Sequence, residues 1–525
     1  MKTRHCVLVA FLTITLLVTG AQPMVLAAPK RGGTLTVIIA EDVRHLDIIF
    51  DGGTEGRYVN NQVTDGLVNT DRNGKIVPAL AETWTVSADG TVYTFKLRRN
   101  VKFHDGTDFD ASDVKWNLDR LLDSKVSYAA NRYRTFIKSV EVLDNYTVRI
   151  TTPGPNPDFM PLIAAGRETD FHSPEAVQKW GRDYGVRAIV GTGPFKFKEW
   201  IKGERLVLVR NENYWKPGLP YLDSIVYRPM PEESLRVVSL RAKQADVALD
   251  PALADVAKLR DDERFKVMTY SGGTLNLIYF NTCKKPFDDL RVRQALYYGI
   301  DRKAIAEAVF YGFAEPGSGI FPSWHWAHDK TWERTIFPYN PQRAAELLTQ
   351  AGFSQRNPLE FTLTTSDASE YVDQATLVQN QLAKIGVKAK VLPLDKTALT
   401  ASQNPPLGQL PAFDAGLYRL KKGNLTTDYT WRSYAAGSPT QLTWYNRPCG
   451  YKNPDIEKLM DDALTIVDRE KAIPINRKIS EIATQDATRI VLSYVQNVNM
   501  LWNYVEGMGI DVLDDFPMET VWLNK

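Results

Sequence analysis

The chain has 525 residues, of which 44% are hydrophobic and 24% are charged, proportions typical of globular proteins. Its formal net charge is +2 and no stretch is rich in lysine and arginine, so nucleic acids and anionic membranes are not expected as partners. About 500 residues are enough for two or three domains.

The N-terminus has the order of segments found in a secretory signal peptide. Lys2 and Arg4 precede an uncharged, mostly apolar stretch over Cys6–Val18, and small residues ending at Ala27 form a cleavage pattern. A membrane anchor is the alternative, but the apolar stretch is shorter than the roughly 20 residues that span a bilayer. We therefore expect residues 1–27 to be cleaved and the mature protein to be soluble and periplasmic.

Strand patterns come first along the chain. Thr34–Ala40 reads as a strand, and Glu82–Leu97 and Val140–Ile150 each read as a hairpin. Between the hairpins, Val114–Leu122 has apolar residues on one helical face, with Asp110 as its expected N-cap.

The later segments predict a β-α-β arrangement. A helix is expected to begin at Asn340-Pro341 and to end at Gly352. Leu359–Thr364 and Val387–Leu392 read as strands separated by a helix over Tyr371–Ile385, so the two strands are expected to run parallel.

The C-terminal part predicts two more helices and a final strand. One helix is expected after Asn453-Pro454, and a kink or break is expected at Pro474 in the next. Ile490–Met500 is apolar and β-prone, and we expect it to rejoin a sheet built earlier in the chain.

Cys283 and Cys449 are the only cysteines after residue 27. An oxidising periplasm permits a disulfide between them, whereas two buried free thiols are the alternative that we favour. Neither belongs to a C-x-x-C motif or has metal-ligand spacing, so we expect neither to take part in function.

Many ordered motifs resemble those of one protein family. They are Gly66–Val68, Gly74–Trp84, Phe95–Thr107, Gly191–Phe195, Arg210–Asn211, Tyr214–Trp215, Pro286–Asp289, Arg291–Leu296 and Ile300–Arg302. The chain resembles the family 5 extracellular solute-binding proteins, the dipeptide, oligopeptide and nickel class, over nearly all of residues 31–525.

The resemblance implies a cluster C-like α/β periplasmic binding protein with two lobes and an extra subdomain in lobe I. Lobe I is expected over residues 28–277 and 490–525, with the subdomain at about 60–190, and lobe II over 278–489. The chain would cross between the lobes twice, at Thr274–Phe280 and Ile490–Tyr494, and these crossings would act as the hinge. Ligand contacts both lobes only when they close, so it shifts the population towards the closed form.

The resemblance also implies a role and partners. The protein would capture a small organic ligand or peptide and deliver it to the inner-membrane permease of an ABC importer. We expect a monomer with no cofactor, no catalytic residue and no bound metal.

From lobe I, the resemblance implies that a loop after the first strand lines the cleft. The corresponding residues are Phe50, Asp51, Gly52, Gly53, Thr54 and Glu55. The glycines allow a close approach of the backbone to a ligand, although an ordinary surface loop is the alternative.

From lobe II, peptide-binding members place an aspartate after a strand, where it pairs with the amino terminus of the peptide. Here the strand Phe413–Tyr418 is followed by Arg419, Lys421 and Lys422, and no acid stands after the strand where the amine-binding carboxylate is expected. If Tyr418, Arg419 and Lys421 face the cleft, they favour a ligand with an anionic group over a free-amine peptide. The alternative is that the lysines face solvent.

Trp324-His325-Trp326-Ala327-His328 is an unusual run. Two histidines three residues apart can share a helical face, but no third metal ligand is evident and Pro322 favours a loop. We expect Trp324 and Trp326 to pack or to stack on ligand.

Two other functions remain open. A periplasmic hydrolase would need a catalytic motif, and the chain contains none of G-x-S-x-G, H-E-x-x-H, C-x-x-C or a Walker-type loop. A ligand sensor without a transport role would differ in its genetic neighbours.

Overall fold

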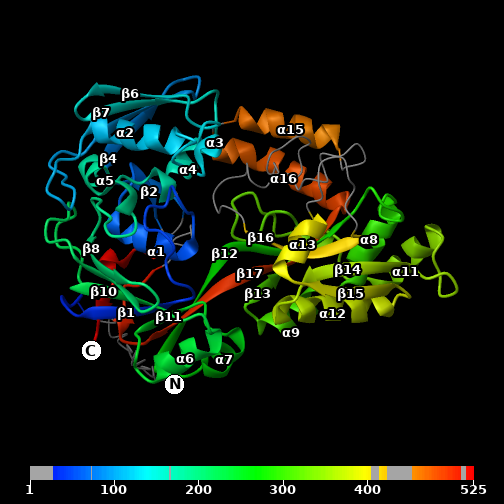
Figure 1. Ribbon diagram of the computed structural model, residues 1–525. Coiled ribbons are helices and arrows are strands. Elements are labelled where there is room, and N and C mark those ends of the chain that lie inside the picture. The colour runs from blue at the N-terminus through cyan, green and yellow to red at the C-terminus, as the bar shows by residue number, and fades with distance from the viewer. Residues whose placement is uncertain are drawn as a thin grey trace, which may run out of the picture.

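The computed structural model describes residues 28–71, 74–164, 167–403, 413–421, 452–466, 468–509 and 516–525. The expected signal peptide at 1–27, Lys422 and Cys449 lie outside these residues. Two lobes of mixed α and β structure lie side by side, and the long strands β12 (Phe265–Phe280) and β17 (Arg489–Trp502) run through both (Figure 1). The two-lobed α/β fold expected from the sequence is confirmed.

Within the described residues, one 11-stranded sheet passes through both lobes, in the order β15-β14-β16-β12-β17-β11-β1-β10-β9-β8, with β13 paired to β17 beside this path. Its lobe I strands are β1 (Thr34–Ile39), β8 (Phe195–Ile201), β9 (Arg205–Arg210), β10 (Ser224–Pro229) and β11 (Val247–Leu249). Its lobe II strands are β13 (Ala314–Pro316), β14 (Glu360–Ser366), β15 (Lys388–Leu394) and β16 (Ala415–Lys421).

β12 and β17 pair antiparallel where they pass between the lobes. Their register shifts twice, between Ser271 and Thr274 and between Asn276 and Leu277. β17 also pairs with β11 in lobe I. The apolar strand predicted over Ile490–Met500 therefore rejoins an earlier sheet, as expected.

A second sheet, in the order β4-β5-β7-β6, forms the outer part of lobe I and is covered by α2 (Ala111–Leu122). Its strands are β4 (Ala81–Val86), β5 (Val92–Leu97), β6 (Ser139–Asp144) and β7 (Thr147–Thr151), which confirms both predicted hairpins. Asp110 caps α2 by accepting a hydrogen bond from the Ser112 N–H at 2.7 Å, and Asp113 accepts one from the Asp110 N–H at 2.9 Å. This reciprocal capping box confirms the predicted helix start.

Shorter elements complete lobe I. Its remaining helices are α1 (Thr54–Val63), α3 (Ala130–Tyr133), α4 (Phe159–Ala164), α5 (Pro174–Trp180), α6 (Glu233–Arg241) and α7 (Leu253–Leu259). Two small antiparallel pairs join β2 (Val68–Thr70) to β3 (Ile76–Pro78) and β18 (Val505–Glu506) to β19 (Trp522–Leu523).

Lobe II has the predicted β-α-β arrangement. β14 and β15 are parallel and are joined by α12 (Ser369–Ala383). Asn340 caps α11 (Pro341–Gln350) by accepting from the Arg343 N–H at 2.9 Å, and Gly352 has a φ of +92°, which suits a glycine after a helix. The other helices are α8 (Leu290–Gly299), α9 (Arg302–Phe310), α10 (Trp332–Thr335), α13 (Lys396–Gln403), α15 (Pro454–Leu464) and α16 (Arg469–Gln485).

Of the kink or break predicted at Pro474, the break is wrong, because α16 continues through this residue. A proline at this position removes one hydrogen bond, to the carbonyl of Glu470. The helix extends for three further turns, and Ile479 and Ala483 pack in the core of lobe II. Tertiary packing of these later turns offsets the local penalty.

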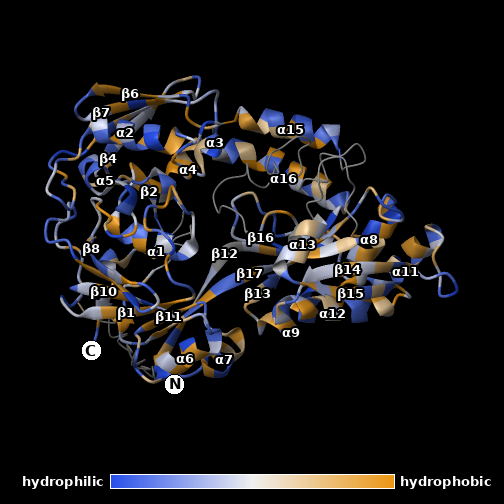
Figure 2. Cartoon of the chain, viewed as in Figure 1, coloured by the Kyte–Doolittle hydropathy of each residue, from blue (hydrophilic) through white to orange (hydrophobic). Residues whose placement is uncertain are grey.

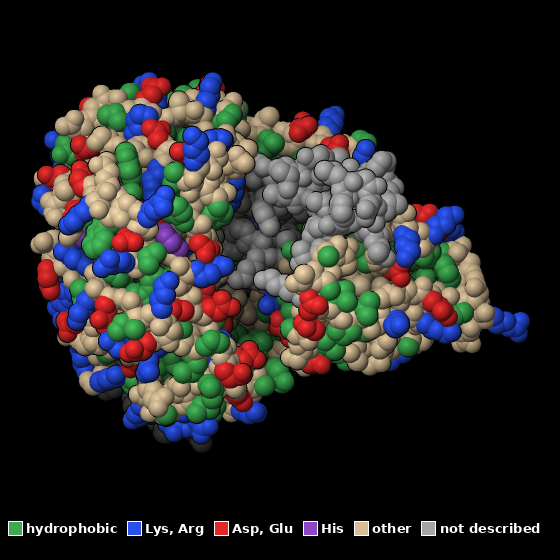
Figure 3. Space-filling model, in the orientation of Figure 1, with side chains coloured by type: hydrophobic (Ala, Val, Ile, Leu, Met, Phe, Trp, Pro, Cys, Tyr) green, Lys and Arg blue, Asp and Glu red, His purple; other side chains and the backbone are tan. Residues whose placement is uncertain are grey.

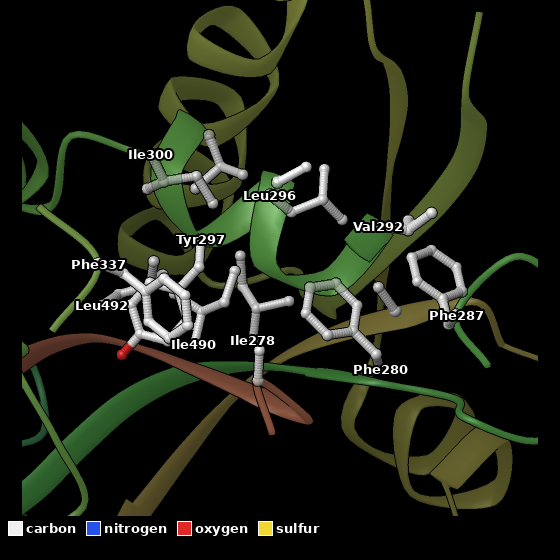
Figure 4. Packing of buried hydrophobic residues seen from close by; sticks show 14 of the residues in the cluster. Ile278, Phe280, Phe287, Val292, Leu296, Tyr297, Ile300, Phe337, Ile490 and Leu492 are labelled. Atoms are coloured by element: carbon white, nitrogen blue, oxygen red, sulfur yellow. The ribbon is translucent and has the colours of Figure 1, made fainter. Parts of the chain in front are cut away.

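The core of lobe II forms where α8 lies across the crossing strands. Ile278 and Phe280 of β12 and Ile490 of β17 point towards Leu296 and Tyr297 of α8 (Figure 4). Figure 2 shows apolar and polar residues alternating along helices such as α15, whose apolar face joins the same core. Each large side chain buried here contributes about 1.5–3 kcal/mol.

Cys283 is disulfide-bonded, which corrects the interpretation of both cysteines as free thiols. The other two cysteines, Cys6 and Cys449, lie outside the described residues. In the part of the chain that the structure describes, none of the helices is long and apolar enough to cross a bilayer.

Candidate ligand-binding site

The directions of the strands locate a site between the lobes. β17 enters lobe I antiparallel to β11, and β1 and β10 run parallel to β11, so the carboxyl ends of these three strands point towards lobe II. In lobe II, β14 and β15 run parallel to β16, and Lys421 at the end of β16 pairs with Thr274 next to the crossing. Ligands of open α/β sheets bind outside such carboxyl ends. Figure 3 shows a hollow between the two lobes.

On lobe I, the predicted contact loop has a defined conformation. Asp51 forms an ion pair with Arg44 at 3.0 Å. Gly53 is the N-cap of α1, so Thr54 and Glu55 lie in the first turn of that helix and not in a loop. Gly52 lies against Tyr128, where an added Cβ would come within 2.2 Å of the tyrosine hydroxyl, so a larger residue requires the ring to move.

Two exposed aromatic side chains lie at this loop, one within it and one packed beside it. Phe50 is 50% exposed and Tyr128 is 57% exposed. The Tyr128 hydroxyl donates to Glu168, which also accepts from Tyr133 at 3.1 Å. This hydrogen bond at the hydroxyl end fixes the position of the exposed ring. Tyr128 just precedes α3, and α3 lies at the edge of lobe I that faces lobe II (Figure 1). Flat rings held in this way are suited to covering a ligand.

A buried ion pair supports the loop. Asp47 is fully buried and accepts a hydrogen bond from Arg120, whose guanidinium lies 5.6 Å from the centre of the Phe50 ring. The second carboxylate oxygen of Asp47 is 3.9 Å from Nε2 of His172. Burial lowers the pKa of His172 to about 4, so this histidine is neutral at pH 7.

The lowered pKa of His172 predicts that the free energy of unfolding depends on pH. Its folded pKa lies below the ordinary value of about 6.5, so its stabilising effect is fully present above pH 6.5 and is lost as pH falls towards 4. That loss corresponds to about 3 kcal/mol. We expect His172→Asn to reduce the fall in unfolding free energy between pH 7 and pH 4 by this amount in denaturant titrations. An equal fall in both proteins would contradict the prediction.

On lobe II, the structure changes the interpretation of the basic stretch. Arg419 lies in β16 and pairs with Glu370 at 2.7 Å, while its guanidinium lies 5.2 Å from the centre of the Tyr371 ring. Its Nε also approaches the side-chain oxygen of Asn276 at 3.4 Å. Arg419 is therefore not an unpaired cation, because the first turn of α12 brings an acid to it. Tyr418 is half-buried in the same strand, and the structure describes only the backbone of Lys421.

The tryptophan–histidine run lies in a loop that packs on lobe II. The rings of Phe321, His325 and Trp326 are stacked with centroids 4.4 and 5.1 Å apart, and Trp326 contacts the lobe II core. Trp324 is half-buried with its ring 6.1 Å from His325. Among the described residues, no three potential ligands are arranged to hold a metal.

Several sequence motifs meet around one buried carboxyl group in lobe I. Asp65 accepts hydrogen bonds from Thr192 at 2.8 Å and from the Trp215 indole at 3.0 Å, and burial raises its pKa. Tyr214 and Lys216 reach Glu519 at 2.7 and 2.8 Å. These motifs therefore tie the C-terminal segment to the body of lobe I and have a structural role.

Sequence reasoning missed Tyr128 and Glu370. Neither belongs to a motif, and each meets its partners only through the tertiary fold. The exposed ring of Tyr128 beside the glycines of the loop is visible only once the lobe is assembled.

Comparison with known proteins agrees with this geometry. The family described as bacterial extracellular solute-binding proteins, family 5 Middle, matches residues 75–447. The glutathione-binding protein GsiB of Escherichia coli (strain K12) is 35% identical over 368 residues, which cover 69% of this chain and 69% of that protein. The chain belongs to the family 5 extracellular solute-binding proteins.

Solved structures of similar proteins extend the match to almost the whole chain. The ABC transporter-associated periplasmic binding protein DppA from Helicobacter pylori, in complex with the peptide STSA, matches with a TM-score of 0.76 and 26% identity, over 94% of this chain and 99% of that one. AgaA from A. tumefaciens R10, in complex with agropinic acid, matches with a TM-score of 0.74 and 27% identity, over 94% and 99%.

These relatives are binding proteins and not enzymes. This family 5 protein is accordingly the solute-binding component of an ABC importer.

Proposed function

We propose that the protein captures a short, peptide-like ligand carrying both an ammonium and a carboxylate group, and delivers it as a periplasmic monomer to an inner-membrane ABC permease. Glutathione is the first candidate, because GsiB is named as a glutathione-binding protein. A small organic acid, as in the AgaA complex, is the second.

The observation that carries the ligand class is the Glu370–Arg419 pair at the carboxyl ends of the lobe II strands. Both side chains are about one-third exposed, so a ligand can reach them. The Asp51–Arg44 pair offers the same two charges on lobe I. A ligand with both charges can replace one partner of each pair and gain charge-assisted hydrogen bonds.

The two lobes would close because a bound ligand contacts both of them. We propose that lobe I comprises residues 28–277 and 490–525, that lobe II comprises 278–489, and that β12 and β17 bend at the crossing. The two register shifts beside residues 271–277 support this choice, because irregular pairing leaves fewer ladder hydrogen bonds to break. Bending of a few residues lets each lobe move as a rigid body.

Calorimetry against glutathione, N-acetylglutathione, di- and tripeptides and small carboxylates tests the ligand class. We expect glutathione or a short peptide to bind, and Glu370→Gln to weaken its binding about tenfold, since an ammonium loses its ionic partner. The N-acetylated form lacks that ammonium, so its affinity should not respond to Glu370→Gln.

Two results would contradict the ligand class. Tight binding of carboxylates alone would favour the organic acid. Equal effects of Glu370→Gln on both glutathione forms would show that Glu370 does not contact the ammonium.

A further inference from the structure

Lobe II contains a cavity of about 500 Å³, away from the residues assigned to the ligand site. It opens where the N-terminus of α9 meets β13 and Tyr494 of β17. The residues that carry its chemistry are Arg302, Lys303, Glu315, His328 and Arg334. None of its lining residues belongs to the loop at 50–55 or to β16.

Arg302 brings a buried positive charge to this cavity. It is 7% exposed, and its guanidinium donates to the carbonyl oxygens of Gly317, Ile336 and Phe337. Its face lies 4.9 Å from the centre of the Tyr297 ring. These partners are neutral, and Arg302 forms no ion pair with a carboxylate of the described residues. A buried cation without an ionic partner is unfavourable, and an anion in the cavity would relieve this penalty.

Other groups add to the positive potential. Arg334 forms no ion pair with any described residue, and Lys303 approaches Glu307 only at 3.8 Å. The carboxylate of Asp301 accepts from the Ala304 N–H at 3.1 Å and so caps α9. This carboxylate offsets the positive end of the α9 dipole, so the positive potential comes from the arginine and lysine side chains.

A buried histidine supplies an unused hydrogen-bonding group. His328 is 6% exposed, and its Nδ1 lies 2.9 Å from the carbonyl oxygen of Phe321, so Nδ1 carries the hydrogen. Its Nε2 is buried and has no partner within the described part of the chain. Asp301 and Glu315 are the acids in the lining, and they are outnumbered by the three cations Arg302, Lys303 and Arg334.

We propose that this cavity binds a small molecule through an oxyanion, either a carboxylate or a phosphate group. Its volume suits a small organic molecule, since ligand pockets measure about 300–1,000 Å³. Tyr494 lines the cavity, lies in the crossing strand β17 and accepts hydrogen bonds from the Ser318 and Gly319 N–H groups at 3.0 and 2.9 Å. A molecule bound in this cavity would therefore contact β17, a strand that joins the two lobes.

Calorimetry of the mature protein with citrate and with inorganic phosphate tests the proposal. Arg334 is exposed, so Arg334→Gln should fold normally. It should weaken binding of the probe about tenfold by removing one charged contact. Arg343→Gln is the matched control, because Arg343 lies on α11 outside the lining and pairs with Glu346.

The site is supported if either probe binds, if Arg334→Gln weakens that binding, and if Arg343→Gln leaves it unchanged. Citrate alone then identifies a carboxylate ligand, and phosphate alone a phosphorylated one. If neither probe binds at millimolar concentration, or if binding is the same in both variants, the proposal is overturned.

Discussion

Replacing Asp47 with alanine is expected to lower the free energy of unfolding by about 3–5 kcal/mol. Asp47 is fully buried, and its partner Arg120 is only 11% exposed. Removing the carboxylate leaves the guanidinium buried without its ionic partner, which costs more than the ion pair itself contributes. Denaturant titrations at pH 7 measure this difference.

The matched control is Asp51→Ala, which removes the acid of the neighbouring Arg44–Asp51 pair. Arg44 is largely exposed, so this surface pair is expected to contribute at most about 1 kcal/mol. If the two variants unfold at the same denaturant concentration, the Asp47–Arg120 pair does not stabilise the fold more than the surface pair does, and the prediction is wrong.

Replacing Phe50 and Tyr128 together with alanine is expected to weaken ligand binding about a thousandfold. Both rings are about half exposed without ligand, so the loss of stability should be limited to about 1–3 kcal/mol, mainly from the lost hydrogen bond between Tyr128 and Glu168, and the variant should remain folded. An aromatic side chain that becomes fully covered on binding contributes about 2 kcal/mol, and two such anchors give about 4 kcal/mol. The measurement is calorimetry with whichever glutathione or peptide ligand binds the unaltered protein.

Tyr311→Ala provides the control for this loss. Tyr311 is 47% exposed but follows α9 in lobe II, away from the loop at 50–55. Affinity should not change in this variant. A double variant of Phe50 and Tyr128 that keeps its affinity would place the ligand elsewhere.

Much of the fold followed from local chemistry. Asp110, Asn340 and Asn453 each cap the predicted helix, because their side chains accept hydrogen bonds from the first-turn N–H groups. The hairpins and the parallel pair of β14 and β15 followed from short-range patterns in the same way. Pro474 shows the limit, since packing of a helix face at residues far along the chain overrode a local signal.

The site was less accessible to prediction. The loop at 50–55 was expected from the family resemblance, whereas its support by Asp47 and Arg120 depends on the fold. Arg419 was interpreted as an unpaired cation because its own neighbours in sequence are basic. The acid that pairs with it, Glu370, lies in α12, which connects β14 to β15. No sequence pattern predicts that α12 and β16 bring these two residues together.

Small-angle X-ray scattering of the mature protein, with and without saturating ligand, tests most directly whether the two lobes close on a solute. The ligand for this measurement is glutathione or the short peptide that binds in calorimetry. We expect a smaller radius of gyration in the bound state, because a ligand that contacts both lobes favours the closed form. An unchanged radius of gyration at saturation would contradict it.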